Sequence, residues 1–322
     1  VCLESQLKWK LLWHDQIKDD TPLRPLVSLD FGVVLEASLF GVEAVFQEGS
    51  DPWCGEPVIQ TEQDLDRLEP VDFSTSGIMP RIHRIYQEMG DLTGGVLPVA
   101  FPGWARGIWS VACMTRGFTP LFMDLIRAPQ FVHRLMQKIV DTRIEFETQR
   151  CRFLGIDPRD DTYQWEYCVY RPTSNSAQYN DEVDGALFSA DTYREFILPY
   201  ERQLAEFYDG VSYYHSCGTM TLLFNDLLTL PNFYRLHVSQ SSDLATAMSG
   251  EGWGKIENSL DPFSDVLEAT PEHISARLAA ISHTAGDRNV EVWADAIYVG
   301  GRDTLEKVKQ VVALFRELHG YS

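Results

Sequence analysis

The chain has 322 residues, of which 44% are hydrophobic, so it can bury a large core without disulfide support. Its formal net charge is −20, and so acidic a chain repels phosphate backbones, which argues against nucleic acid as a partner. No apolar run approaches the roughly 18 residues of a membrane span, and residues 1–13 lack a secretory signal pattern, so we expect a cytoplasmic protein with no membrane partner.

Apolar periodicity and capping residues indicate the elements. Up to about residue 90 the pattern is irregular, with strands at 26–30 and 42–47 and helices at 33–39 and 61–68. The middle of the chain predicts strands at 96–101 and 162–170, a helix from Thr119 as its cap to 127, a long helix from Pro129, and a helix capped by Ser189. From residue 211 onward we expect strands at 211–214, 234–238, 253–257 and 290–293, with helices at 219–230, 271–283 and 304–318 and a short one after 242.

This alternation of strands and helices predicts a parallel sheet, either closed into a barrel or doubly wound. Neither a GxGxxG nor a GxxxxGK phosphate loop occurs, which favours the barrel. The predicted fold is therefore a single (β/α)8 TIM barrel over residues 1–322, with an irregular N-terminal segment at about 1–90. In such barrels the active site lies at the C-terminal ends of the strands.

His215 and Cys217 stand two residues apart at one such strand end, so a period of two places both side chains on one face. Imidazole and thiolate are zinc ligands, and Gly218 followed by Thr219 as a helix cap would place Cys217 at a helix N-terminus, where thiolate is favoured. The alternative is a buried histidine and cysteine that are merely neighbours. The other five cysteines have no CxxC spacing and are expected to be reduced, mostly buried thiols.

Four segments resemble the uroporphyrinogen decarboxylase superfamily: 187–199 (LFSADTYREFILP), 215–218 (HSCG), 257–262 (ENSLDP) and 270–272 (TPE). The resemblance covers most of the chain from about residue 90 and is weaker before it. It implies a uroporphyrinogen decarboxylase-like (β/α)8 barrel. The arginine-rich segment with which the true decarboxylases grip substrate carboxylates is absent, and HSCG instead resembles the cobalamin-linked methyltransferase branch.

That branch implies a zinc ion bound by His215, Cys217 and a later cysteine, with a corrinoid that carries the methyl group. No cysteine follows Cys217 here, and the corresponding place holds Asp295, which is the expected third metal ligand. The chain contains no visible corrinoid-binding domain, so the cofactor is expected on a partner protein that docks over the barrel mouth.

The remaining candidates are polar or aromatic residues near predicted strand ends. Asp181 and Glu182 are candidate catalytic carboxylates, as general acid or as orienting groups; the alternative is a solvated loop. Candidate substrate-binding residues, each with core packing as the alternative, are Trp104, Glu166, Tyr213, His237 and Asn258.

These features together predict a corrinoid-dependent methyltransferase that demethylates a small methoxylated, perhaps aromatic, compound. The alternatives are transfer from a methylated corrinoid to a thiol, a cofactor-free decarboxylase of a uroporphyrinogen-like polycarboxylate, and a corrinoid or porphyrin carrier without catalysis. The decarboxylase would need a cluster of Arg or Lys at the mouth, and the carrier would need no metal.

Overall fold

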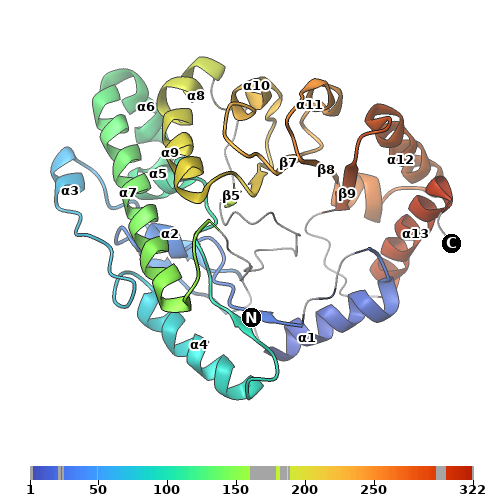
Figure 1. Cartoon of the computed structure of the whole chain (residues 1–322), viewed down its shortest axis with the longest axis horizontal. Helices are drawn as coiled ribbons and strands as arrows, with labels where there is room; N and C mark the ends of the chain where they lie inside the picture. The colour runs from blue at the N-terminus through green and yellow to red at the C-terminus, as the bar shows by residue number, and fades with distance from the viewer. Residues whose placement is uncertain are drawn as a thin grey trace.

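The computed structural model describes residues 3–20, 23, 25–48, 50–159, 179–181, 187, 189–294 and 302–320. Helices form a ring around centrally placed strands (Figure 1), the arrangement of a (β/α)8-type barrel, as the sequence predicts. The strands are β1 (Val27–Ser28), β2 (Ala44–Val45), β3 (Trp53–Cys54), β4 (Val99–Ala100), β5 (Tyr179–Asp181), β6 (Tyr213–His215), β7 (Arg235–Val238), β8 (Lys255–Leu260) and β9 (Val290–Ala294).

The helices of the ring vary in length from one turn to seven. They are α1 (Leu3–Leu12), α2 (Leu35–Ser38), α3 (Glu62–Asp66), α4 (Met79–Thr93), α5 (Ile108–Arg116), α6 (Phe118–Arg127), α7 (Pro129–Leu154), α8 (Ala190–Phe196), α9 (Leu198–Tyr208), α10 (Phe224–Leu227), α11 (Leu244–Ser249), α12 (Pro271–Ala285) and α13 (Arg302–His319). Short π or 3-10 turns are η1 (Trp13–Ile17), η2 (Thr221–Leu223) and η3 (Pro262–Leu267). No helix in the described part of the chain is long and apolar enough to cross a membrane.

The sheet order is that of a barrel wall. β5, β6, β7, β8 and β9 pair in chain order, every pair parallel, and β1 pairs in parallel with β4. Helices connect the strands on the outside, as parallel crossovers require. β2 and β3 form a separate antiparallel pair.

The two faces of the five-stranded sheet differ in chemistry. Leu236, Val238 and Ile256 lie on one face, are at most 2% exposed, and belong to the same core as side chains of the surrounding helices. The residues that alternate with them, such as Arg235 and His237, therefore point into the barrel. The barrel interior is polar in this part of the wall.

Local signals explain where several helices begin and end. Thr61 and Asp64 form a capping box at α3, and the side chain of Ser189 accepts a bond from Thr192 N at α8, as predicted. Pro129 stands at the first position of α7, and the helix ends at Gly155, whose φ of 70° suits glycine.

Some expectations for individual elements were wrong. Thr119 lies inside α6 and does not cap it, because the helix begins at Phe118 after Gly117. The helix predicted at 219–230 is broken into η2 and α10, and Thr219 caps neither. Helices α1, α4 and α5 were not predicted, and the strand predicted at 162–170 lies outside the described residues.

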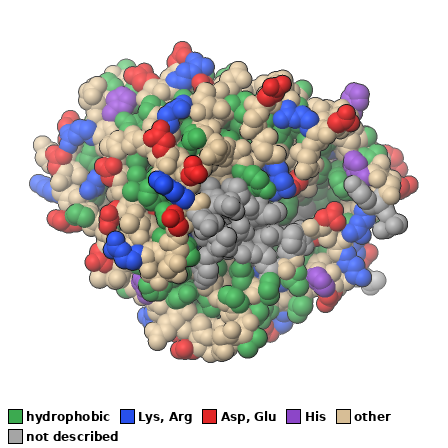
Figure 2. Space-filling model, viewed as in Figure 1, with side chains coloured by type: hydrophobic (Ala, Val, Ile, Leu, Met, Phe, Trp, Pro, Cys, Tyr) green, Lys and Arg blue, Asp and Glu red, His purple; other side chains and the backbone are tan. Residues whose placement is uncertain are grey.

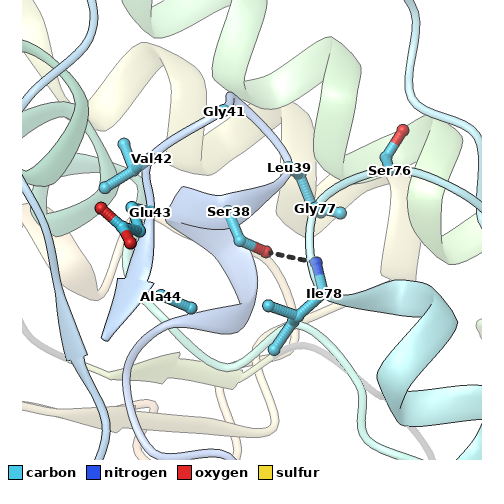
Figure 3. Close-up of a pocket in the computed structure, with 9 residues that line it drawn as sticks. All are labelled: Ser38, Leu39, Gly41, Val42, Glu43, Ala44, Ser76, Gly77 and Ile78. Carbon is cyan, nitrogen blue, oxygen red and sulfur yellow. Dashed lines mark hydrogen bonds between the residues drawn. The ribbon is translucent and has the colours of Figure 1, made fainter. Parts of the chain in front are cut away.

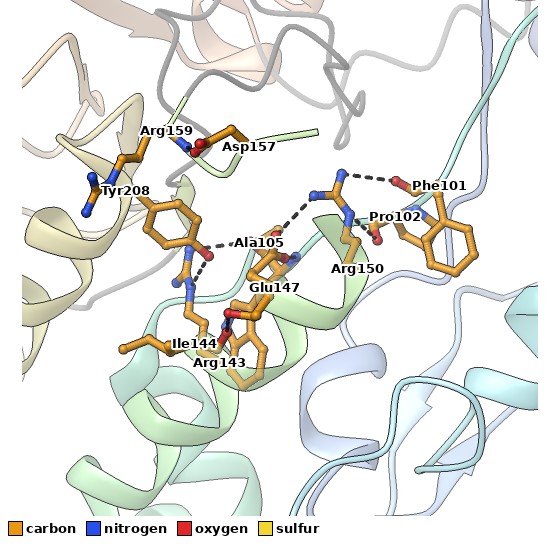
Figure 4. A network of polar contacts seen from close by, with 12 residues as sticks. Phe101, Pro102, Ala105, Arg143, Ile144, Glu147, Arg150, Asp157, Arg159 and Tyr208 are labelled. Atoms are coloured by element: carbon orange, nitrogen blue, oxygen red, sulfur yellow. Dashed lines mark hydrogen bonds and ion pairs between the residues drawn. The ribbon is translucent and has the colours of Figure 1, made fainter. Parts of the chain in front are cut away.

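A buried polar network holds the irregular segment that follows β4 (Figure 4). Glu147 Oε1 accepts a hydrogen bond from Trp104 N at 2.8 Å, and the other carboxylate oxygen pairs with Arg150 at 3.0 Å. Arg150 Nε donates to Pro102 O at 3.1 Å. These side chains satisfy backbone groups that have no strand partner there, so α7 fixes the path of the chain out of β4.

Glu36 on α2 also binds backbone groups of this irregular segment, and its pKa leads to a prediction of pH-dependent stability. Its Oε1 accepts from Ala105 N at 2.8 Å and Arg106 N at 3.0 Å, and burial raises the pKa of this carboxyl although those bonds oppose the shift. A raised folded-state pKa contributes stability that is present below the usual carboxyl range and is lost as pH rises through the folded value. Glu36→Gln keeps the acceptor oxygen and cannot ionise.

We expect the free energy of unfolding of the wild type to fall, relative to Glu36→Gln, as pH rises above about 4.3. Denaturant unfolding of both proteins across this range measures the difference. Glu145→Gln, an exposed site on α7, is the control and should follow the wild type. Parallel curves for the wild type and Glu36→Gln would contradict the prediction.

The described part of the surface carries charges of both signs. On the face shown in Figure 2, the acidic and basic side chains of the described residues are interspersed.

Candidate functional site

The strongest candidate site is the end of β6, where the sequence predicts two metal ligands. His215 is the last residue of the strand and half-buried, and Cys217 is exposed two residues later. The distance from His215 Nε2 to Cys217 Sγ is 3.8 Å. Two ligands of one tetrahedral zinc, with bonds of about 2.0 and 2.3 Å, are about 3.5 Å apart. The pair therefore fits two corners of such a site.

Hydrogen bonds shape the backbone between the two side chains. Gly218 N donates to Ser216 Oγ at 3.1 Å, which turns the chain sharply after Cys217. The side chain of His237, on the next strand, bonds through Nδ1 to Ser216 O at 3.0 Å. The expected helix does not begin directly after Cys217, since η2 starts only at Thr221 and α10 at Phe224, so the turn sets this position.

A row of titratable residues crosses the inner face of the sheet at this level. The register pairs Asp181 with His215, His237 with Glu257, and Glu257 with Glu291. Tyr214 pairs with Leu236, which makes His215 and His237 neighbours, and their ring centroids are 4.4 Å apart. The strands β6 to β9 thus each contribute one acid or imidazole to the same row, and Asp181 of β5 occupies the register position next to His215.

Tyr213 and Arg235, which stand two residues before His215 and His237 on their strands, hold the carboxylates of this row in place. Tyr213 OH donates to Glu257 Oε1 at 3.0 Å, and the ring of Tyr213 lies parallel to that of His215 at 6.1 Å. Arg235 pairs with Glu257 at 3.4 Å and with Glu291 at 2.6 Å. Lys255 also pairs with Glu291, at 3.0 Å, so two cations and two carboxylates lie together next to the His215–Cys217 pair.

The structure separates two predicted substrate residues from this site. Trp104 is 2% exposed, its ring contacts Phe40 and Phe146 edge-on, and its Nε1 donates to Arg106 O at 2.9 Å. Asn258 lies on the outer face of β8, is 1% exposed, and donates through Nδ2 to Val238 O at 3.1 Å. Both side chains serve packing in this structure.

Tyr213 and His237, by contrast, lie on the inner face beside His215, and their role in substrate binding stays a prediction. Asp181 occupies the register position next to His215, and nothing beyond its backbone is described. Glu182, Glu166 and Asp295 lie outside the described residues. Their roles stay predictions.

Four residues of this neighbourhood were not singled out from the sequence: Arg235, Ser239, Glu257 and Glu291. The signal was present, because Arg235 and His237 alternate with apolar Leu236 and Val238 in one strand. Polar residues at every second position of a buried strand indicate a polar interior face.

No three His, Cys, Asp or Glu side chains of the described residues converge as a set of metal ligands. The assignment of His215, Cys217 and Asp295 as ligands stays a prediction, since Asp295 lies outside the described residues.

A separate cavity lies between the end of α2 and the beginning of α4 (Figure 3). Its volume is about 350 Å³, and its lining residues are Ser38, Leu39, Gly41, Val42, Glu43, Ala44, Ser76, Gly77 and Ile78. Ser38 Oγ already accepts a hydrogen bond from Ile78 N at 3.2 Å, and Glu43 is the only titratable group in this lining. This cavity therefore lacks the paired groups that the end of β6 has.

Comparisons with known proteins bear on the family. Residues 26–151 match the family model "Uroporphyrinogen decarboxylase (URO-D)", so the match includes the N-terminal segment in which the motifs are weakest. No curated protein matches the sequence. A methyltransferase from Methanosarcina mazei has a similar structure, with a TM-score of 0.67 and 16% identity over 98% of this chain and 86% of that one. The family model and the shared fold confirm the resemblance to the uroporphyrinogen decarboxylase superfamily that the sequence motifs indicate.

Proposed function

We propose that this protein is a zinc-dependent methyltransferase that moves a methyl group between a small methoxylated compound and a corrinoid protein. The observation that carries the proposal is the 3.8 Å separation of His215 Nε2 and Cys217 Sγ at the end of a barrel strand. The structural similarity to a methyltransferase of the same fold supports the reaction class.

His215 and Cys217 would hold the zinc, with Asp295 as the proposed third ligand. When bound, zinc supplies Lewis-acid polarisation of the ether oxygen of the substrate. A carboxylate in place of a second thiolate makes the ligand set harder, which suits an oxygen substrate better than a thiol. The proposal therefore favours demethylation over transfer to a thiol.

The residues beside His215 would shape the side of the site that receives the substrate. Tyr213 and His237 flank His215 on the inner face and present aromatic rings to that side of the site. Such rings suit a planar methoxylated compound. Cys217 is exposed, so a cofactor carried by a second protein can approach the metal position from outside.

The proposed reaction gives a direct spectroscopic prediction. A methoxyarene mixed with Co(I) corrinoid should yield the methyl-Co(III) spectrum when the protein is present and zinc-loaded, and no such change without it. Cys217→Ser should abolish the change, because one of the two described ligands is removed. Cys113→Ser, which alters a half-buried thiol in α5, should leave it intact.

Other outcomes would assign another function. Methylation of a thiol by methylated corrinoid, with no reaction of methoxy compounds, would show that the protein transfers the methyl group from the corrinoid to a thiol. Decarboxylation of a porphyrinogen, with a broad panel of methyl donors and thiols inactive, would show a decarboxylase. Corrinoid binding without any turnover would show a carrier.

A further inference from the structure

The segment that carries His215 and Cys217, the two proposed zinc ligands, is held in place by hydrogen bonds to the neighbouring strand β7 and the turn after it. The ligand loop (residues 215–221) runs irregularly from the end of β6 into η2. Four hydrogen bonds join it to β7 and to the turn that follows. They are His237 Nδ1 to Ser216 O (3.0 Å), Ser239 Oγ to Gly218 O (2.9 Å), Met220 N to Ser242 Oγ (2.9 Å) and Asp243 N to Thr221 Oγ1 (2.9 Å).

Among the side chains that make these bonds, His237 also contacts His215, one of the two proposed metal ligands. Its ring lies 4.4 Å from that of His215, centroid to centroid, at an interplanar angle of 47°. It is 2% exposed, so its position is fixed by packing. A carbonyl oxygen only accepts, so the neutral ring carries its proton on Nδ1 and donates to Ser216 O. One side chain thus restrains both the His215 ring and the backbone between the two ligands.

We infer that His237 is a positioning residue, which holds His215 and Cys217 in the geometry that receives the metal before the metal binds. The inference rests on the proposed zinc site and concerns how this chain prepares it. Groups that hydrogen-bond around metal ligands orient them and raise affinity by removing the cost of ordering them on binding. His237 acts through His215, whose ring it contacts, and through Ser216, whose carbonyl oxygen it binds.

Two substitutions separate the contributions of His237. His237→Leu removes both the hydrogen bond and the imidazole ring. His237→Asn keeps an N–H donor at about the position of Nδ1 and removes only the ring. Zinc affinity is measured by competition with a chromophoric chelator, and the shape of the loop by amide hydrogen exchange of residues 216–221 in the metal-free protein.

We expect His237→Leu to bind zinc roughly 10–100-fold more weakly, the effect typical of residues that support metal ligands. Amides of the ligand loop should exchange faster in this variant even without metal. His237→Asn should restore the slow exchange and most of the affinity. Ser239→Ala, which removes the bond to Gly218 O, should change both readouts in the same direction but less.

His83→Leu is the matched control. His83 Nε2 makes a 3.0 Å bond to the carbonyl of Phe73, the same kind of bond outside the site. Its loss should leave zinc affinity and ligand-loop exchange as in the wild type.

Equal zinc affinity and equal loop exchange in His237→Leu and His83→Leu would overturn the inference and leave the zinc site standing. If the wild type binds no zinc, the proposed function fails, and the exchange rates of the metal-free variants still decide whether His237 holds the loop. If His237→Leu does not fold, His237→Asn and Ser239→Ala decide the same question by the same two measurements.

Discussion

Cys217→Ser protein should fold like the wild type and lose nearly all of its zinc. The wild type is expected to contain close to one zinc per chain, because the 3.8 Å between His215 Nε2 and Cys217 Sγ fits two corners of one tetrahedral site. A hydroxyl does not ionise near neutral pH as a thiol does, so the variant loses both the anionic charge and the soft donor atom. Zinc affinity should fall by more than the roughly 10–100-fold typical of substitutions around a metal site.

Metal analysis of the purified proteins and far-UV circular dichroism measure the two parts of this result. The fold should persist because Cys217 is exposed and contributes little buried surface. Cys113→Ser, in α5, is the control for loss of a thiol and should keep its zinc. Full zinc occupancy in the His215→Ala, Cys217→Ser double variant would end the assignment of this pair as ligands.

The second half of the fold could be read from the sequence because its signals are local. Strand β7 was expected at 234–238 and spans Arg235–Val238, and the period-two alternation that predicts it also predicts which residues face the interior. Helix α12 was expected from Pro271 and begins there, because Thr270 caps it and proline suits the first turn.

The errors concern features that depend on distant parts of the chain. Trp104 follows a predicted strand and was placed at the barrel mouth, but its ring packs against Phe40 and Phe146, which no local pattern reveals. Helix α4 is an exception, because Pro80 near its start and Gly94 after its end are local signals for it.

The candidate site also combines features that local sequence signals predict with features that depend on contacts between distant parts of the chain. The spacing of His215 and Cys217 was enough to predict that they share a face, and the 3.8 Å separation of their donor atoms confirms this. Their relation to His237 and Glu257 depends on the strand register, which comes only from the pairing of β6, β7 and β8. The sequence therefore predicted the pair of His215 and Cys217, whereas the residues that lie beside this pair could be identified only from the fold.

The carboxylates of Glu257 and Glu291 in this row are paired with the buried cation Arg235. Removing its charge should strongly lower the free energy of unfolding. Arg235 is 1% exposed and lies within 3.4 Å of Glu257, which is fully buried, and within 2.6 Å of Glu291. Arg235→Met removes the positive charge between two carboxylates and leaves Glu257 without its ionic partner. Breaking a buried pair from one side typically costs about 3–5 kcal/mol, so the free energy of unfolding at neutral pH should fall by that amount.

Denaturant unfolding of three further variants tests the reason for this loss. Arg235→Met with Glu257→Leu should recover part of the stability, because the second change removes the buried carboxylate that has lost its contact with Arg235. Arg134→Met breaks the exposed pair with Glu62, at 2.9 Å, and should change the free energy of unfolding by no more than about 1 kcal/mol. Glu257→Leu alone provides the remaining corner of the cycle. If Arg235→Met is no more destabilised than Arg134→Met, the charges inside the barrel wall are not what holds this row in place.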